Sequence, residues 1–159
     1  MSRRRDIRRR VVQLMQADAA LYGPTGLLQE IYDHTPADVG GRHPVLCMMA
    51  SSSNVWTTFR RLGTVYALKL MALAKYAEIS ADARLVRDLA GDAIWTEADA
   101  FDSLDAISEA LRLWVQANTK EAGGLWIAID YGGRSAVDVV TIGGTTYLRE
   151  TVDLLFGDQ

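Results

Sequence analysis

The first periodic pattern of apolar side chains lies between residues 6 and 22. Apolar positions recur there every three or four residues, at Ile7, Val11, Leu14, Met15, Leu21 and Tyr22. This spacing predicts an amphipathic helix. The helix should stop at Gly23-Pro24, because glycine suits the position after a helix and proline cannot continue one. The following stretch, 25–44, is predicted to be a flexible loop anchored by four apolar residues: Leu27, Leu28, Ile31 and Tyr32.

Two further apolar runs, 45–53 and 64–76, favour β-strands. The second run is ambiguous, because its alanine, leucine, lysine and methionine residues also favour helix. Alternation decides for a strand, since an apolar set from Tyr66 to Tyr76 lies on one face of an extended chain and both lysines lie on the other. Residues 80–90 are predicted to form a short helix that ends near Gly91.

A second and clearer amphipathic helix begins at Thr96. Threonine is a favoured N-cap residue, and Glu97 and Asp99 place carboxylates at the positive end of the helix dipole. The apolar stripe continues at helical spacing as far as Val115, and Gly123-Gly124 closes the segment.

The last third of the chain is divided by two Gly-Gly pairs. Gly132-Gly133 and Gly143-Gly144 separate β-branched and aromatic runs, which is a strong signal for hairpin turns. Strands are therefore predicted over 125–131, 134–142 and 145–156. The whole order predicts an α+β fold: a mostly antiparallel sheet with a C-terminal three-stranded meander and two main helices packed on one face.

Composition agrees with one globular domain over residues 1–159. The chain has a mass of 17.5 kDa and is 49% hydrophobic and 23% charged, which suits a protein with a single core. The lone Cys47 excludes an internal disulfide and suits assembly in a reducing cytoplasm. No uncharged apolar run reaches the length of a membrane span, so we expect no membrane association.

Charge is unevenly distributed along the chain. The first ten residues contribute +5 to a total net charge of −3, which leaves −8 for the remainder. We expect residues 1–5 to form a basic tip ahead of the first helix. Such arginines could bind nucleic-acid phosphates without sequence preference, but no basic-aromatic surface follows them. They could equally pair with the acidic surface of a neighbouring subunit.

Catalytic chemistry has few candidates in this sequence. His34 and His43 stand in the polar loop near acidic residues, but two imidazoles without a third ligand are a weak metal signal. Cys47 has apolar neighbours and is predicted to be buried and inert. The serines 51–53 lack a nucleophile-elbow pattern, and neither Gly-Gly pair resembles a phosphate loop. We therefore expect no enzyme, no cofactor and no metal site. An enzyme using the His34–His43 loop is retained as an alternative.

The C-terminal half resembles the tail terminator proteins of long-tailed bacteriophages and related tailed particles. The resemblance covers about the last 65 residues, from the acidic helix TEADAFDSLDAISEALRLWVQAN to WIAIDYGGRSAVDVVTIGGTTYLRETVDLLF. The pattern consists of three parts: Ala98, Leu104 and Asp105; Ser135-x-x-x-Val139 leading into Ile142-Gly143-Gly144; and Tyr147-x-x-Glu150-x-Val152. The remaining chain fits this family only by the order of its elements.

The resemblance implies a structural virion protein, assembled in the host cytoplasm and located at the neck between head and tail. Such proteins form rings of six copies that cap the tail tube, stop its polymerisation and join the tail to a head-completion protein, while DNA passes through the lumen without specific binding. Another neck component, or a small nucleic-acid-binding protein, is the alternative. Exposure suggests these interface residues: Arg3, Arg4, Arg5, Arg8, Arg9, Thr25, Arg42, Gly132, Gly133, Gly143 and Gly144.

Overall fold

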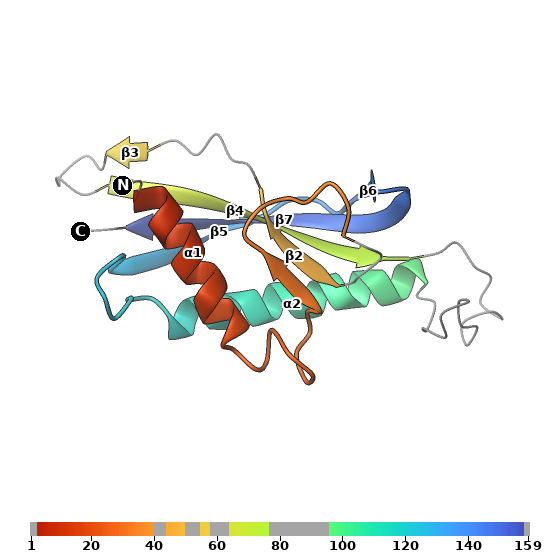
Figure 1. Ribbon diagram of the computed structural model, residues 1–159, viewed down its shortest axis with the longest axis horizontal. Coiled ribbons are helices and arrows are strands. Elements are labelled where there is room, and N and C mark those ends of the chain that lie inside the picture. The colour runs from red at the N-terminus through yellow and green to blue at the C-terminus, as the bar shows by residue number, and fades with distance from the viewer. Residues whose placement is uncertain (1–2, 40–43, 50–54, 58–63, 77–95, 158–159) are drawn as a thin grey trace.

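A computed structural model describes residues 3–39, 44–49, 55–57, 64–76 and 96–157. These ranges contain two helices and a seven-stranded, mostly antiparallel sheet (Figure 1). The predicted α+β class is therefore confirmed. The predicted helix at 80–90 lies outside the described residues.

Helix α1 spans Arg3–Gln16 and buries one apolar stripe against the sheet. It begins three residues before the expected start, so Arg3, Arg4 and Arg5 belong to the helix and do not form a separate tip. It also ends earlier than predicted. The side chain of Asp18 accepts a hydrogen bond from the backbone of Ala20 at 2.9 Å, and the Asp18 carbonyl accepts from Tyr22. Aspartate competes in this way with helical bonding and turns the chain before Gly23.

The segment 25–44 contains a short strand that the sequence did not indicate. Strand β1, Glu30–Tyr32, runs parallel to β2, Val45–Met48. The prediction of a continuous loop is therefore wrong here. Leu28 and Ile31 are buried anchors as expected, whereas Leu27 is 36% exposed.

Strand β4, Thr64–Lys75, confirms the strand predicted from alternation. It occupies the middle of the sheet, between β2 on one side and β7, Thr145–Gly157, on the other. Strand β3, Val55–Thr57, also pairs with β4, beyond the end of β2. Even-numbered residues of β4, such as Leu68 and Leu70, join the main core with α1, and odd-numbered residues face the other side of the sheet.

Helix α2, Glu97–Ala117, starts where the sequence predicted, on a capping box. The backbone N–H of Asp99 donates to the Thr96 hydroxyl, and the Thr96 N–H donates to the Asp99 carboxylate at 2.8 Å. The helix ends at an Asn118 cap, before the expected Gly123-Gly124. Both helices contribute to one core cluster on the same face of the sheet, as predicted.

The C-terminal strands form a meander-like set whose connections differ from the prediction. Strands β5, Ala128–Arg134, and β6, Asp138–Ile142, both pair antiparallel with β7, along different parts of its length. Gly132 and Gly133 lie inside β5, so the turn predicted there is wrong. They form a bulge after Tyr131, with Gly133 at a φ of +118°. An added Cβ at Gly132 would lie 3.1 Å from the carbonyl oxygen of Asp153.

The predicted turn at Gly143-Gly144 is confirmed. Both glycines have positive φ, +59° and +80°, as a two-residue turn between β6 and β7 requires. An ideal Cβ on Gly143 would come within 2.6 Å of the Asp38 carboxyl, whereas one on Gly144 would meet nothing within 4 Å. The hairpin tip therefore lies against the segment that follows β1.

Replacing Gly143 by alanine is expected to destabilise the protein by about 2 kcal/mol, from left-handed strain and the clash with Asp38. Part of this cost should disappear in an Asp38→Ala background, because the clash is removed. Gly144→Ala is the matched control, since it adds only strain and should not respond to Asp38. Urea unfolding of the single and double variants measures these differences. An equal cost for Gly143→Ala in both backgrounds would contradict the contact.

Candidate functional site

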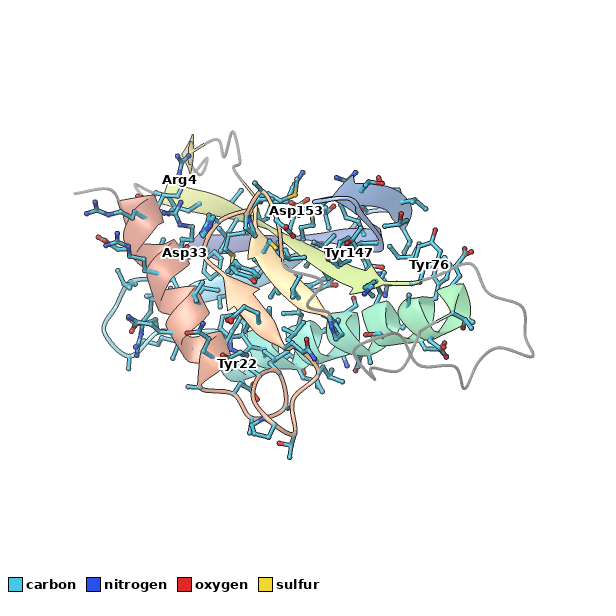
Figure 2. All side chains as sticks on the ribbon, turned by 45° about the vertical axis from the view of Figure 1, so that its right-hand side comes forward. Arg4, Tyr22, Asp33, Tyr76, Tyr147 and Asp153 are labelled. Carbon is cyan, nitrogen blue, oxygen red and sulfur yellow. The ribbon has the colours of Figure 1, made fainter. Side chains whose placement is uncertain are left out.

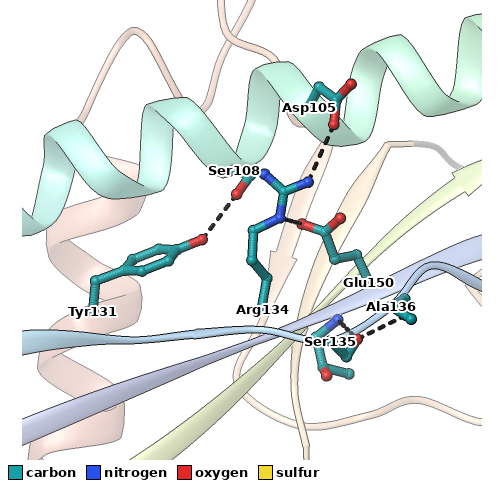
Figure 3. Close-up of polar contacts among 8 residues, drawn as sticks. Asp105, Ser108, Tyr131, Arg134, Ser135, Ala136 and Glu150 are labelled. Atoms are coloured by element: carbon teal, nitrogen blue, oxygen red, sulfur yellow. Dashed lines mark hydrogen bonds and ion pairs between the residues drawn. The ribbon is translucent and has the colours of Figure 1, made fainter.

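Polar side chains from α2, β5 and β7 meet between the helix and the sheet (Figure 3). Arg134 of β5 is central to this cluster. Its Nε lies 3.2 Å from Glu150 Oε1, and a terminal nitrogen lies 3.3 Å from Asp105 Oδ1. Beside them the hydroxyls of Ser108 and Tyr131 form a hydrogen bond of 2.8 Å. One guanidinium therefore joins the long helix to the C-terminal hairpin.

Glu150 is a charged side chain within the apolar layer of the sheet. It is 2% exposed, and its Oε2 atom has no hydrogen-bond partner among the described residues. Burial raises the pKa of this carboxyl, and Arg134 acts in the opposite direction. The net shift of the pKa is upward, so burial destabilises the carboxylate more than Arg134 stabilises it.

Replacing Glu150 by glutamine is expected to change stability in a pH-dependent way. A carboxyl with a raised folded-state pKa contributes most below its unfolded value of 4.5, and the contribution is lost as pH rises through the folded-state pKa. The stability of Glu150→Gln relative to the natural protein should therefore increase between pH 4 and pH 7. Urea unfolding at both pH values tests this. A difference that stays constant, or that moves the other way, would contradict the raised pKa.

Several of the residues that carry the family resemblance meet in the fold. Leu104 and Val152 are buried in the main core, and Asp105 and Glu150 contact the same arginine. The hydroxyl of Ser135 accepts a hydrogen bond from the backbone N–H of Thr151 at 2.9 Å, where the chain passes from β5 to β6. Part of the pattern therefore meets around Arg134, whereas Tyr147 packs on the other face of the sheet.

A second buried carboxylate, Glu121, ties α1 to the segment after α2. Its side chain is 5% exposed and lies 3.2 Å from Arg10 Nε. The backbone N–H of Leu125 donates to Glu121 Oε2 at 3.0 Å. Hydrogen bonds from Leu125 and Gly123, and then Arg10, hold the pKa of this carboxyl below its ordinary value. The sequence did not single out this residue, because a glutamate beside two glycines is typical of an exposed loop.

The predicted arginine contacts fall on different sides of α1. Arg4, Arg5 and Arg9 are exposed, and Arg3 begins the helix. Arg8 is half-buried, and its Nε has no hydrogen-bond partner among the described residues. Arg10 is occupied by Glu121 and Gln13. The exposed guanidiniums are therefore those of the outer face.

The other predicted interface residues are scattered. Thr25 is exposed in the turn after α1, and Arg42 lies outside the described residues. Gly143 and Gly144 form an exposed hairpin tip beside Asp38, so the structure brings this tip and the segment after β1 together. Gly132 and Gly133 lie within β5, at the bulge near the end of the strand.

The candidates for catalysis show ordinary surroundings. His34 is exposed, and its Nδ1 lies 2.7 Å from the carboxylate of its neighbour Asp33; His43 lies outside the described residues. Cys47 is fully buried, and burial raises its thiol pKa to about 12, as expected for an inert cysteine. Across the described ranges, no three histidine, cysteine or acidic side chains are grouped closely enough to hold a metal ion.

A groove and several exposed apolar side chains stand out on the surface. The groove, of about 1060 Å³, lies between the turn after α1 and the first half of α2. Its lining includes Tyr22, Leu27, Asp102 and Ser103. Large apolar residues are more than a third exposed at five positions: Leu27, Phe101, Leu113, Ile127 and Val139. Of these five residues Leu27 lines the groove, and an exposed apolar side chain beside a groove favours contact with another protein.

Neither described helix combines the length and the apolar character needed to cross a bilayer. No protein-family model matches the chain, and no curated protein sequence matches it.

Proposed function

We propose that this protein is a structural virion component of the tail-terminator type. Copies would associate into a closed ring that caps the tail tube, stops its growth and joins it to the neck. The observation that carries this proposal is that Arg134 of β5 joins α2 to β7 through Asp105 and Glu150, two residues of the family resemblance. The capped start of α2 and the Gly143-Gly144 turn also support the resemblance.

The surface also supports a protein that works by contact. A closed ring needs two different patches on each subunit, because each copy meets the next through a heterologous interface. The exposed arginines of α1 and the groove beside α2 are two such patches, with different chemistry. The unequal faces of such a ring would let one side bind the tube and the other the neck.

The test combines tail tubes with the purified protein. We expect a ring-sized species by analytical ultracentrifugation, and rings at the ends of tubes by negative-stain electron microscopy. Adding the protein to polymerising tube subunits should halt elongation. A chain that stays monomeric at high concentration and leaves tube growth unchanged would overturn the proposal. Rings that bind head-completion proteins and ignore tubes would assign the chain to another neck position.

A further inference from the structure

The groove between the turn after α1 and helix α2 has walls suited to an arginine side chain. Tyr22 and Leu27 supply aromatic and aliphatic surface, and the carboxylate of Asp102 supplies negative charge. An arginine can lay its apolar stem along such a wall, stack its planar guanidinium on an aromatic ring and keep its charge beside an acid. The groove therefore combines apolar walls with a negative charge.

Negative charge surrounds the groove on the α2 side. The helix carries exposed carboxylates and no basic residue before Arg112, and of these carboxylates Asp102 lines the groove: Glu97, Asp99, Asp102, Asp105 and Glu109. Asp105 and Glu109 already contact arginines of the same chain. Glu97 and Asp102 are exposed on the two turns nearest the amino end of the helix. A positively charged partner is consequently favoured at this place.

The strongest positive charge on the described surface lies at the amino end of α1. Arg4 and Arg5 are exposed there, and Arg9 is exposed in the middle of the helix. Arg5 lies 3.8 Å from Asp6, and Arg9 lies near Asp33. Basic residues at this end of a helix oppose the helix dipole, which favours carboxylates. An acidic partner would therefore add favourable interactions at this end of the helix.

One copy cannot place its own arginines in its own groove. Arg4 lies near the amino end of α1, whereas Tyr22 lies beyond the other end of the helix (Figure 2), and a helix of 14 residues is roughly 21 Å long. The amino ends of α1 and α2 lie on opposite sides of the molecule (Figure 1). Complementary patches placed in this way join copies head to tail.

We propose that the groove receives the amino end of α1 from a second copy of this chain, with Arg4, Arg5 and Arg9 facing Glu97 and Asp102. This contact rests on the proposed function in one respect: it would be the interface that is repeated around the ring. Aliphatic stems cover Leu27 and Tyr22, and ion pairs fix the direction of each subunit.

Charge reversal on each side tests this contact. One variant carries Arg4→Glu, Arg5→Glu and Arg9→Glu, and the other carries Glu97→Lys and Asp102→Lys. Each alone should raise the concentration needed for assembly by about tenfold or more. An equimolar mixture should assemble again when the two variants alternate. The reversed, acidic α1 end of one variant then faces the reversed, basic groove of the other, and the unchanged α1 end faces the unchanged groove at the next interface. Asp130→Lys, a reversal at an exposed site on β5, is the control and should assemble like the natural chain.

Sedimentation of each sample, with circular dichroism to confirm folding, separates the outcomes. Rings that persist in both variants would overturn this interface and leave the proposed function standing. A natural chain that never associates would overturn both. Arginine variants that still form rings and lose salt-sensitive DNA retention would show that these guanidiniums bind nucleic acid, which also overturns the contact. Rescue only in the mixture supports it.

Discussion

Replacing Trp126 by alanine is expected to lower the free energy of unfolding by about 3–5 kcal/mol, which is the range for removing a large buried aromatic side chain. Trp126 is fully buried, and its ring meets Phe156 edge to face at 5.1 Å. Its indole N–H donates to the carbonyl oxygen of Asn118 at 2.9 Å. One side chain therefore fixes the end of α2 against β7.

Urea unfolding measures this loss, and Leu113→Ala is the control. Leu113 lies on α2 and is 51% exposed, so its truncation should cost less than about 0.5 kcal/mol. Trp126→Phe should give an intermediate loss, because it keeps part of the ring contact and removes the bond to Asn118. A cost for Trp126→Ala as small as that of Leu113→Ala would show that the tryptophan is not part of the core.

Replacing Glu121 by glutamine is expected to cost about 2 kcal/mol at pH 7, since hydrogen bonds to charged groups contribute roughly 1.5–3 kcal/mol each. The glutamine side chain carries an NH₂ group in place of one carboxylate oxygen. This group cannot accept the hydrogen bonds that Arg10 and the N–H of Leu125 donate to Glu121. A carboxyl with a lowered folded-state pKa stabilises the protein above its unfolded value of 4.5, and this contribution is lost as pH falls through the folded-state pKa. The cost of Glu121→Gln should therefore shrink in acid.

The two buried glutamates should show opposite pH dependence, which makes each a check on the other. Glu121→Gln loses its penalty toward low pH, whereas Glu150→Gln gains relative stability toward high pH. Glu109→Gln is a surface control, because Glu109 pairs with Arg112 at an exposed position, where solvent screens the interaction and such a pair contributes little. If Glu121→Gln were as mild as Glu109→Gln at pH 7, the tie between α1 and the segment after α2 would be unimportant for stability.

Local signals were sufficient for the elements whose causes lie within a few residues. The start of α2 depends on Thr96 and Asp99, three positions apart, and both are visible in the sequence. The turn at Gly143-Gly144 depends on two adjacent residues that accept positive φ. The alternation of side chains in 64–75 arises because the two faces of β4 differ: even-numbered residues join the main core, and odd-numbered residues face the other side of the sheet.

Other features depend on partners far away in sequence, and local patterns misled or said nothing. Gly132-Gly133 has the same letters as the real turn, but β7 runs past it, and the pair becomes a bulge. Strand β1 is three residues long, too short for periodicity to reveal it, and exists through pairing with β2. Glu121 and Glu150 look like surface residues until Arg10 and Arg134 are placed beside them.

The position of β7 has a consequence for the order of folding. The strand lies between β4 and the pair β5 and β6, and its pairing with β4 joins residues far apart in the chain, such as Ala72 and Glu150. Contacts of such long sequence separation slow folding. Until β7 docks, one edge of β4 stays unpaired, and an unpaired apolar edge favours aggregation.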